Sequence, residues 1–117
     1  MRVYTINVSG GLHALKEALK GLDAWTYSDA EGCINVIRVE RVKALPGHLD
    51  ALIKVTHRPV GRRMWSDLYR FEFQQVGAEI VVVAQRISGM GRTDPDFIID
   101  ALLKLVAFQG SSPQLNA

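Results

Sequence analysis

The chain has 117 residues, of which 48% are hydrophobic and 22% are charged, and these values exclude a disordered or fibrous protein. Its longest uninterrupted apolar run, Ile80 to Ala84, is far shorter than the ~20 residues of a transmembrane helix, and its single cysteine, Cys33, excludes an internal disulfide. The net charge of +2 is concentrated between residues 54 and 70, where basic residues outnumber the single acidic one. We therefore expect one cytoplasmic domain over residues 1–110 that does not span a membrane, followed by a polar tail over residues 111–117.

The first half of the chain predicts a strand, a helix and two further strands. Residues 2–8 alternate between apolar and polar side chains, which indicates a strand. Residues 12–22 place leucines at helical spacing opposite charged residues, so we expect an amphipathic helix that Ser9 could cap. Residues 24–28 and 33–44 return to a period of two. The apolar phase of the second segment slips between Val36 and Ile37, which predicts a bulge or a strong bend there.

Three more strands are predicted over residues 49–57, 64–76 and 79–88. They are separated by the turn-forming sequences "RPVGRR" and "GA". Connections this short join antiparallel neighbours, so we expect one antiparallel sheet.

The last predicted element is a helix that begins near Asp94. Asp94 suits the N-cap position, Pro95 the first helical position and Asp96 the first turn. Charged side chains form one thin stripe along this helix, at Asp96, Asp100 and Lys104, and apolar side chains cover the rest. A helix of this kind must be largely enclosed by the rest of the protein.

The predicted elements follow the order β-α-β5-α, which indicates the α+β class. A curved antiparallel sheet packed round the C-terminal helix is a helix-grip-like arrangement. The order of elements is similar to that of START and Bet v 1-like lipid-binding domains, as a likeness of fold.

Aromatic side chains on the strand over residues 64–76 are predicted to face the C-terminal helix. Two interpretations are open: the rings form the core, or they line a pocket for an apolar or amphiphilic small molecule such as a lipid. The candidate ligand-binding residues are Trp25, Tyr27, Trp65, Asp67, Tyr69, Phe71 and Phe73.

Three arginines, Arg58, Arg62 and Arg63, surround a predicted turn at Pro59 and Gly61. They are either solvated residues that keep a sheet edge soluble or contacts to an anionic partner. Dedicated nucleic-acid-binding proteins carry larger basic patches, so a nucleic-acid partner is not expected.

No spacing in the sequence predicts a catalytic set, a metal site or a cofactor-binding loop. The histidines lack ligand spacing, and the glycines before the last helix do not match a phosphate-binding motif. We expect a small binding module that holds an apolar or amphiphilic ligand between the sheet and the C-terminal helix. The alternative is a homodimeric or adaptor-type protein whose arginine-rich hairpin contacts an acidic partner.

Overall fold

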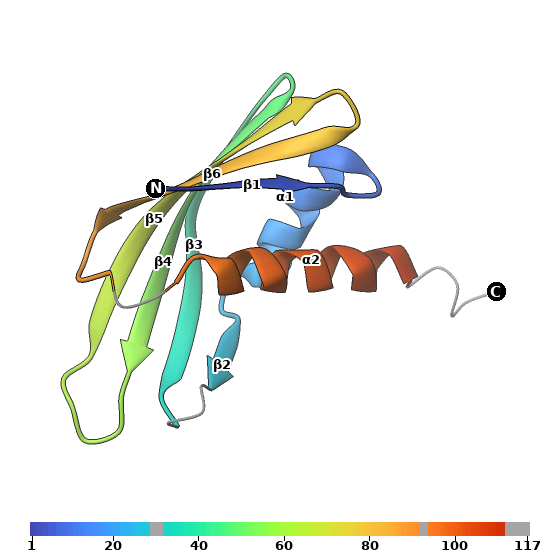
Figure 1. Cartoon of the computed structure of the whole chain (residues 1–117). Helices are drawn as coiled ribbons and strands as arrows, with labels where there is room; N and C mark the ends of the chain where they lie inside the picture. The colour runs from blue at the N-terminus through green and yellow to red at the C-terminus, as the bar shows by residue number, and fades with distance from the viewer. Residues whose placement is uncertain (29–31, 92–93, 112–117) are drawn as a thin grey trace.

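The computed structural model of the chain describes residues 1–28, 32–91 and 94–111, so most of the predicted polar tail lies outside the described residues. Within these residues it contains six strands and two helices (Figure 1). The strands are β1 (Arg2–Ile6), β2 (Thr26–Ser28), β3 (Ile34–Leu45), β4 (His48–Arg58), β5 (Trp65–Val76) and β6 (Glu79–Ser88). The helices are α1 (Gly11–Leu22) and α2 (Asp96–Ser111). Neither described helix is long and apolar enough to cross a bilayer.

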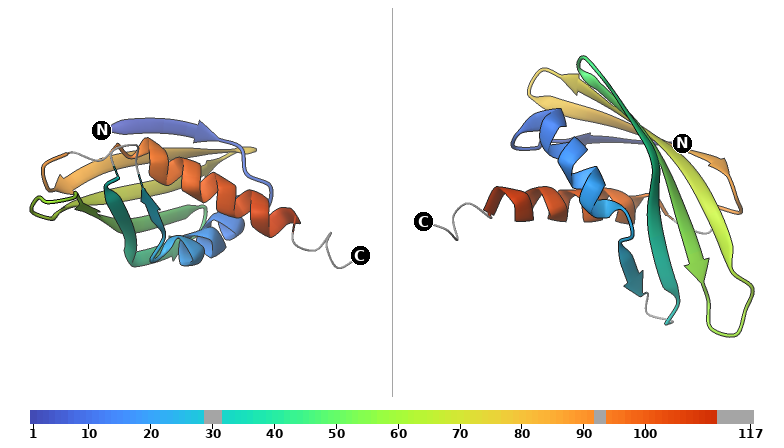
Figure 2. Two further views of the ribbon diagram at one scale, coloured as in Figure 1. Left: turned by 90° about the horizontal axis from the view of Figure 1, so that it is seen from below. Right: turned by 180° about the vertical axis from the view of Figure 1, so that it is seen from behind.

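All six strands belong to one antiparallel sheet in the order β1-β6-β5-β4-β3-β2. The strands from β2 to β6 follow one another in space as they do in the chain, and β1 adds to the free edge of β6. Both helices lie on the concave face of this curved sheet (Figure 2). The predicted α+β class with a curved antiparallel sheet is therefore confirmed.

The register of the sheet shifts at two places. One shift lies between Val39 and Arg41 on β3, and the other between Leu68 and Tyr69 on β5. The bulge predicted between Val36 and Ile37 is wrong, because those two residues pair with β4 in unbroken register. Val36 is a half-buried residue of the convex face, and Ile37 is buried on the concave face. Two consecutive apolar residues therefore lie on opposite faces of a regular strand, and the slip in the alternation is only apparent. Bulges increase local twist, which suits the curvature of this sheet.

Helix α1 begins at two consecutive glycines in the left-handed region, Gly10 with φ 91° and Gly11 with φ 62°. Side chains rarely adopt this conformation, so glycine permits the sharp entry from β1 into the helix. The predicted cap by Ser9 is wrong, because Gly10 occupies the N-cap and no side chain caps the helix. The N–H group of Gly11 donates instead to the carbonyl oxygen of Val8 at 3.0 Å.

Helix α2 starts as the sequence predicts but is less enclosed than expected. The carboxylate of Asp94 accepts a hydrogen bond from the backbone N–H of Asp96 at 3.0 Å, as an N-cap residue does. Ile98 and Leu102 are fully buried against the sheet. Phe108, one turn and a half further along, is 68% exposed because the end of α2 runs past the sheet (Figure 1).

One hydrophobic core fills the space between the concave face and the two helices. Alternate residues of β4, β5 and β6 contribute its floor, and the leucine face of α1 and the inner face of α2 close it. The largest fully buried side chains are Phe71, Phe73, Leu15, Leu19, Leu22, Ile37, Ile53, Ile80, Ile98 and Leu102.

Candidate functional site

The structure separates the predicted ligand-binding residues into different surroundings. Phe71 and Phe73 are fully buried in the core, with ring centroids 6.2 Å apart, and Tyr69 is only 4% exposed. The two helices lie over this part of the sheet, so the two phenylalanines are core residues. They present no surface to a ligand between sheet and helix.

Two of the predicted residues, Tyr27 and Trp65, lie at the far end of the concave face, where the ring of Tyr27 packs on Phe97 of α2 with a centroid distance of 4.6 Å. Tyr27, Asn35, His57 and Trp65 pair across β2, β3, β4 and β5 and form one row, which we call the polar row. The imidazole of His57 stacks on Trp65 with a centroid distance of 4.3 Å. Its Nδ1 atom lies 2.5 Å from Oδ1 of Asn35, which is 1% exposed. The Nδ2 group of Asn35 has no hydrogen-bond partner in the described structure.

Asp67 follows Trp65 by two residues on β5, so it lies on the same face next to the polar row, and it is fully buried. Its Oδ1 atom accepts a hydrogen bond from the backbone N–H of Gly91 at 2.9 Å. Gly89 passes so close that an added Cβ atom would lie 2.1 Å from the same carboxylate oxygen. Asp67 therefore fastens the end of β6 and the following loop to the sheet, which gives it a structural role.

Tyr69 and Trp25 each border a depression in the surface. Tyr69 lines a cavity of about 540 Å³ with Arg2, Arg86 and Asp94 at the edge where β1 meets β6. Arg2 is already paired there, at 3.4 Å from Asp94 and 2.9 Å from Asp96. A smaller apolar depression of about 390 Å³ lies between Trp25 and the end of α2, where Leu105 and Phe108 line it together with Lys104.

The three candidate arginines lie where the sequence predicts. Arg58 ends β4, and Arg62 and Arg63 lie in the connection to β5; all three are exposed. The backbone N–H of Arg62 donates to the carbonyl oxygen of Pro59 at 3.5 Å, which closes the turn. No ion pair forms with any of the three within the part of the chain that the structure describes.

A groove between the two helices was not predicted from the sequence. It has a volume of about 710 Å³ and is bounded by α1, α2 and the segment that joins β1 to α1. We call it the interhelical groove. Its lining residues are Asn7, Val8, Ser9, His13, Ala14, Glu17, Leu103, Val106 and Ala107.

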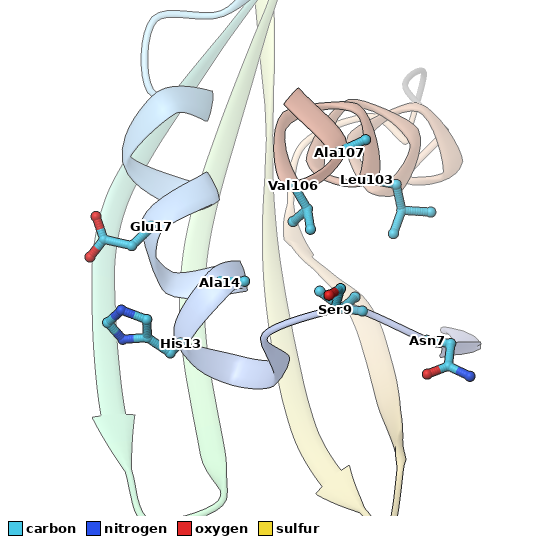
Figure 3. A pocket seen from close by; sticks show the side chains of 9 residues that line it. Asn7, Ser9, His13, Ala14, Glu17, Leu103, Val106 and Ala107 are labelled. Carbon is cyan, nitrogen blue, oxygen red and sulfur yellow. The ribbon is translucent and has the colours of Figure 1, made fainter. Parts of the chain in front are cut away.

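The walls of the interhelical groove are apolar and its rim is polar. Figure 3 shows Ser9 and Ala14 across from Leu103 and Val106, whereas His13 and Glu17 lie on the side of α1 that is turned away from α2. The two helices approach closely at Gly21, where an added Cβ atom would lie 3.5 Å from Leu105. The groove opens at the other end of α1, where the side chain of Ala14 is small.

The electrostatics of the groove are set by few groups. The ammonium group of Lys20 donates a hydrogen bond to Glu17 at 3.1 Å and lowers the pKa of that carboxyl, which stays ionised at neutral pH. The first turn of α1 contains no acidic residue and no capping side chain. It therefore keeps the partial positive charge of a helix N-terminus.

No part of the described structure resembles a metal centre. Within residues 1–28, 32–91 and 94–111, no three histidine, cysteine, aspartate or glutamate side chains lie close enough together to hold an ion.

Comparison of the chain with protein-family models, with curated proteins and with solved structures finds no match. The site must therefore be judged from its own chemistry.

Proposed function

We propose that the protein is a small-molecule binding module that holds an amphiphilic ligand in the interhelical groove. The observation that carries this proposal is the combination of volume and lining. A volume of about 710 Å³ lies within the range of small-molecule sites, and such sites have mostly apolar walls with few polar groups. Leu103, Val106 and Ala107 supply an apolar wall for the body of the ligand.

The polar part of the ligand is expected at the start of α1. Ser9 supplies a hydroxyl group beside the apolar wall, and Asn7 and His13 supply amide and imidazole groups at the rim. The uncapped N-terminus of α1 favours an oxygen-bearing or negatively charged head. Glu17 would repel a carboxylate, so a charged head is expected near Ser9 and not farther along α1.

In this proposal the domain is a variant of the helix-grip arrangement. The space between the sheet and α2 is filled by Phe71 and Phe73, and the ligand lies between the two helices instead. The α+β class and the curved sheet support this likeness, which remains one of fold.

The proposal is tested by titrating the protein with a fluorescent long-chain fatty acid. Ala107→Trp places a large ring at the mouth of the groove and should weaken binding at least about tenfold, which corresponds to ~1.4 kcal/mol. Ala44→Trp adds the same ring to an exposed position of β3 and serves as the matched control. No saturable binding to the wild type, or equal losses in both variants, would count against the groove.

A homodimer is the second candidate function. The exposed end of α2, with Phe108 beside Leu105 and Trp25, gives an apolar surface that a second copy of the chain could cover. Light scattering after size-exclusion chromatography would test it. Phe108→Ser should shift a dimer toward monomer, and a strictly monomeric wild type would rule the dimer out.

A further inference from the structure

The tip of the β4–β5 hairpin, residues 58–64, combines exposed positive charge with exposed apolar surface. Arg58, Arg62 and Arg63 are exposed, and the same short segment leaves Val60 78% and Met64 54% exposed. We call this segment the hairpin tip. It lies at one extremity of the sheet, away from both helices (Figures 1 and 2).

Within the residues that the structure describes, no carboxylate forms an ion pair with the arginines of the hairpin tip. Other arginines of the sheet, Arg38 and Arg70, pair with Asp23 and Asp50 at 3.3 and 2.8 Å. No acidic residue occurs in the sequence between residues 54 and 66, and the next one, Asp67, is fully buried. The three guanidinium groups therefore face solvent as a local cationic surface.

The apolar side chains distinguish the tip from an ordinary solvated turn. Val60 stands beside Gly61, at the point where the chain turns. Ile34, which is 47% exposed, pairs directly with Arg58 on the neighbouring strand. A soluble polyanion would use the arginines alone. An anionic bilayer would use both kinds of side chain, because apolar groups enter the headgroup region while arginines meet lipid phosphates.

We propose that the hairpin tip docks on the surface of a bilayer that contains anionic phospholipids. Each arginine near such a surface contributes about 1 kcal/mol, so contact by three of them with Val60 and Met64 gives weak, reversible attachment. The docking is peripheral and needs no transmembrane segment. It does not depend on the interhelical groove, which is lined by other elements.

The test is co-sedimentation of the full chain with phosphatidylcholine vesicles, with and without phosphatidylglycerol, at low and high salt. The wild type should bind only the anionic vesicles, and salt should weaken the binding. The double variant Arg62→Gln, Arg63→Gln should lower the partition coefficient of the protein onto the vesicles roughly thirtyfold. This factor follows because each arginine contributes about 1 kcal/mol of binding free energy. Arg41→Gln with Lys43→Gln removes the same charge from exposed residues at the other end of the sheet and should change it less than about twofold.

A second pair of substitutions separates a bilayer from a soluble polyanion. Val60→Ser with Met64→Ser keeps every charge and should still lower vesicle binding about tenfold, because it removes the side chains that enter the headgroup region. All variants should keep the wild-type melting temperature, since the substituted positions are exposed. If the double variant Val60→Ser, Met64→Ser binds vesicles as well as the wild type and still binds heparin or RNA, the hairpin tip is a site for a soluble polyanion. Failure of the wild type to bind anionic vesicles, or equal losses in the control pair, would also overturn the proposal.

Discussion

The two ends of the concave face are built from the same strands but have different chemistry. Where the helices lie over it, the face is purely apolar, as in the pairs that Phe73 makes with Leu49 and Val82. At the far end, the same alternation places Asn35, His57 and Trp65 in the polar row. The period of a strand thus tells which face a side chain occupies, but it does not tell whether a buried position is apolar, since Asn35 is only 1% exposed.

The largest expected difference between the two ends comes from truncating one side chain in each. Phe71→Ala should lower the free energy of unfolding by about 3–5 kcal/mol, because Phe71 is fully buried and leaves a cavity. His57→Ala should cost only about 1 kcal/mol, since His57 is half-buried and makes one hydrogen bond. Urea denaturation measures both, and equal costs would mean that the polar row belongs to the core.

A substitution at Gly89 tests how tightly the backbone packs against Ser66 and Asp67 at the polar end of the concave face. Gly89→Ala should destabilise the protein by about 3 kcal/mol, because Gly89 has φ 104° and its new Cβ atom would lie 2.6 Å from the carbonyl oxygen of Ser66. Gly61→Ala is the matched control, since Gly61 also has positive φ but open space around it, and should cost about 1 kcal/mol. Thermal melts of the two variants would separate backbone strain from the added clash.

The link between β1 and α2 should have a moderate effect and a distinctive pH dependence. Tyr4→Phe removes the 2.5 Å hydrogen bond that the Tyr4 hydroxyl donates to Asp96 and should cost about 1 kcal/mol. Burial and this hydrogen bond raise the pKa of Tyr4 above its ordinary value of 10.0. Because the protonated phenol is favoured in the folded state, its contribution is complete below pH 10.0 and is lost as the pH rises beyond it. Stability of the wild type should therefore fall toward that of Tyr4→Phe in strongly alkaline solution, and a constant difference would contradict the assignment.

The smallest effect is expected on the convex face, which no helix covers. Asp50→Asn removes the 2.8 Å ion pair to Arg70 and should cost about 0.5 kcal/mol, since Arg70 is half exposed and water screens the pair. The hydrogen bond from Arg70 lowers the pKa of Asp50 below its ordinary value of 3.8. The contribution is then present above pH 3.8 and is lost as the pH falls below it. Denaturation at neutral and at acidic pH should show the difference between wild type and variant disappearing in acid.

The sequence predicted the sheet, the helices and the exposed hairpin because these follow from local periodicity and turn chemistry. Alternation identified β4, β5 and β6, and Pro59 with Gly61 marked the turn that exposes the arginines. It also marked Phe71 and Phe73 as facing α2, but it left open whether they form the core or line a pocket. That choice depends on how closely two helices pack on the sheet, which strand periodicity does not report.

The interhelical groove and the polar row could not be predicted for a similar reason. Leu103 and Val106 have the pattern of core residues, and only the crossing of α2 over α1 leaves them beside a groove. Asn35 and His57 stand 22 positions apart, and their contact depends on the register of β3 against β4. The contact could have been suspected from the amide and imidazole groups at inward positions of two adjacent strands, because buried polar groups usually form hydrogen bonds with one another.

The pairing of β1 with β6 has a consequence for the order of folding. Strands β3, β4, β5 and β6 are joined by short turns, so their hairpins can form as soon as each is synthesised, at little cost in loop entropy. Strand β1 is made first, yet its partners run from Ile80 to Ala84, near the end of the chain. The ion pairs of Arg2 to Asp94 and Asp96 form later still. During synthesis β1 must therefore stay without its partner until β6 has left the ribosome, and its docking then adds the last strand to the sheet.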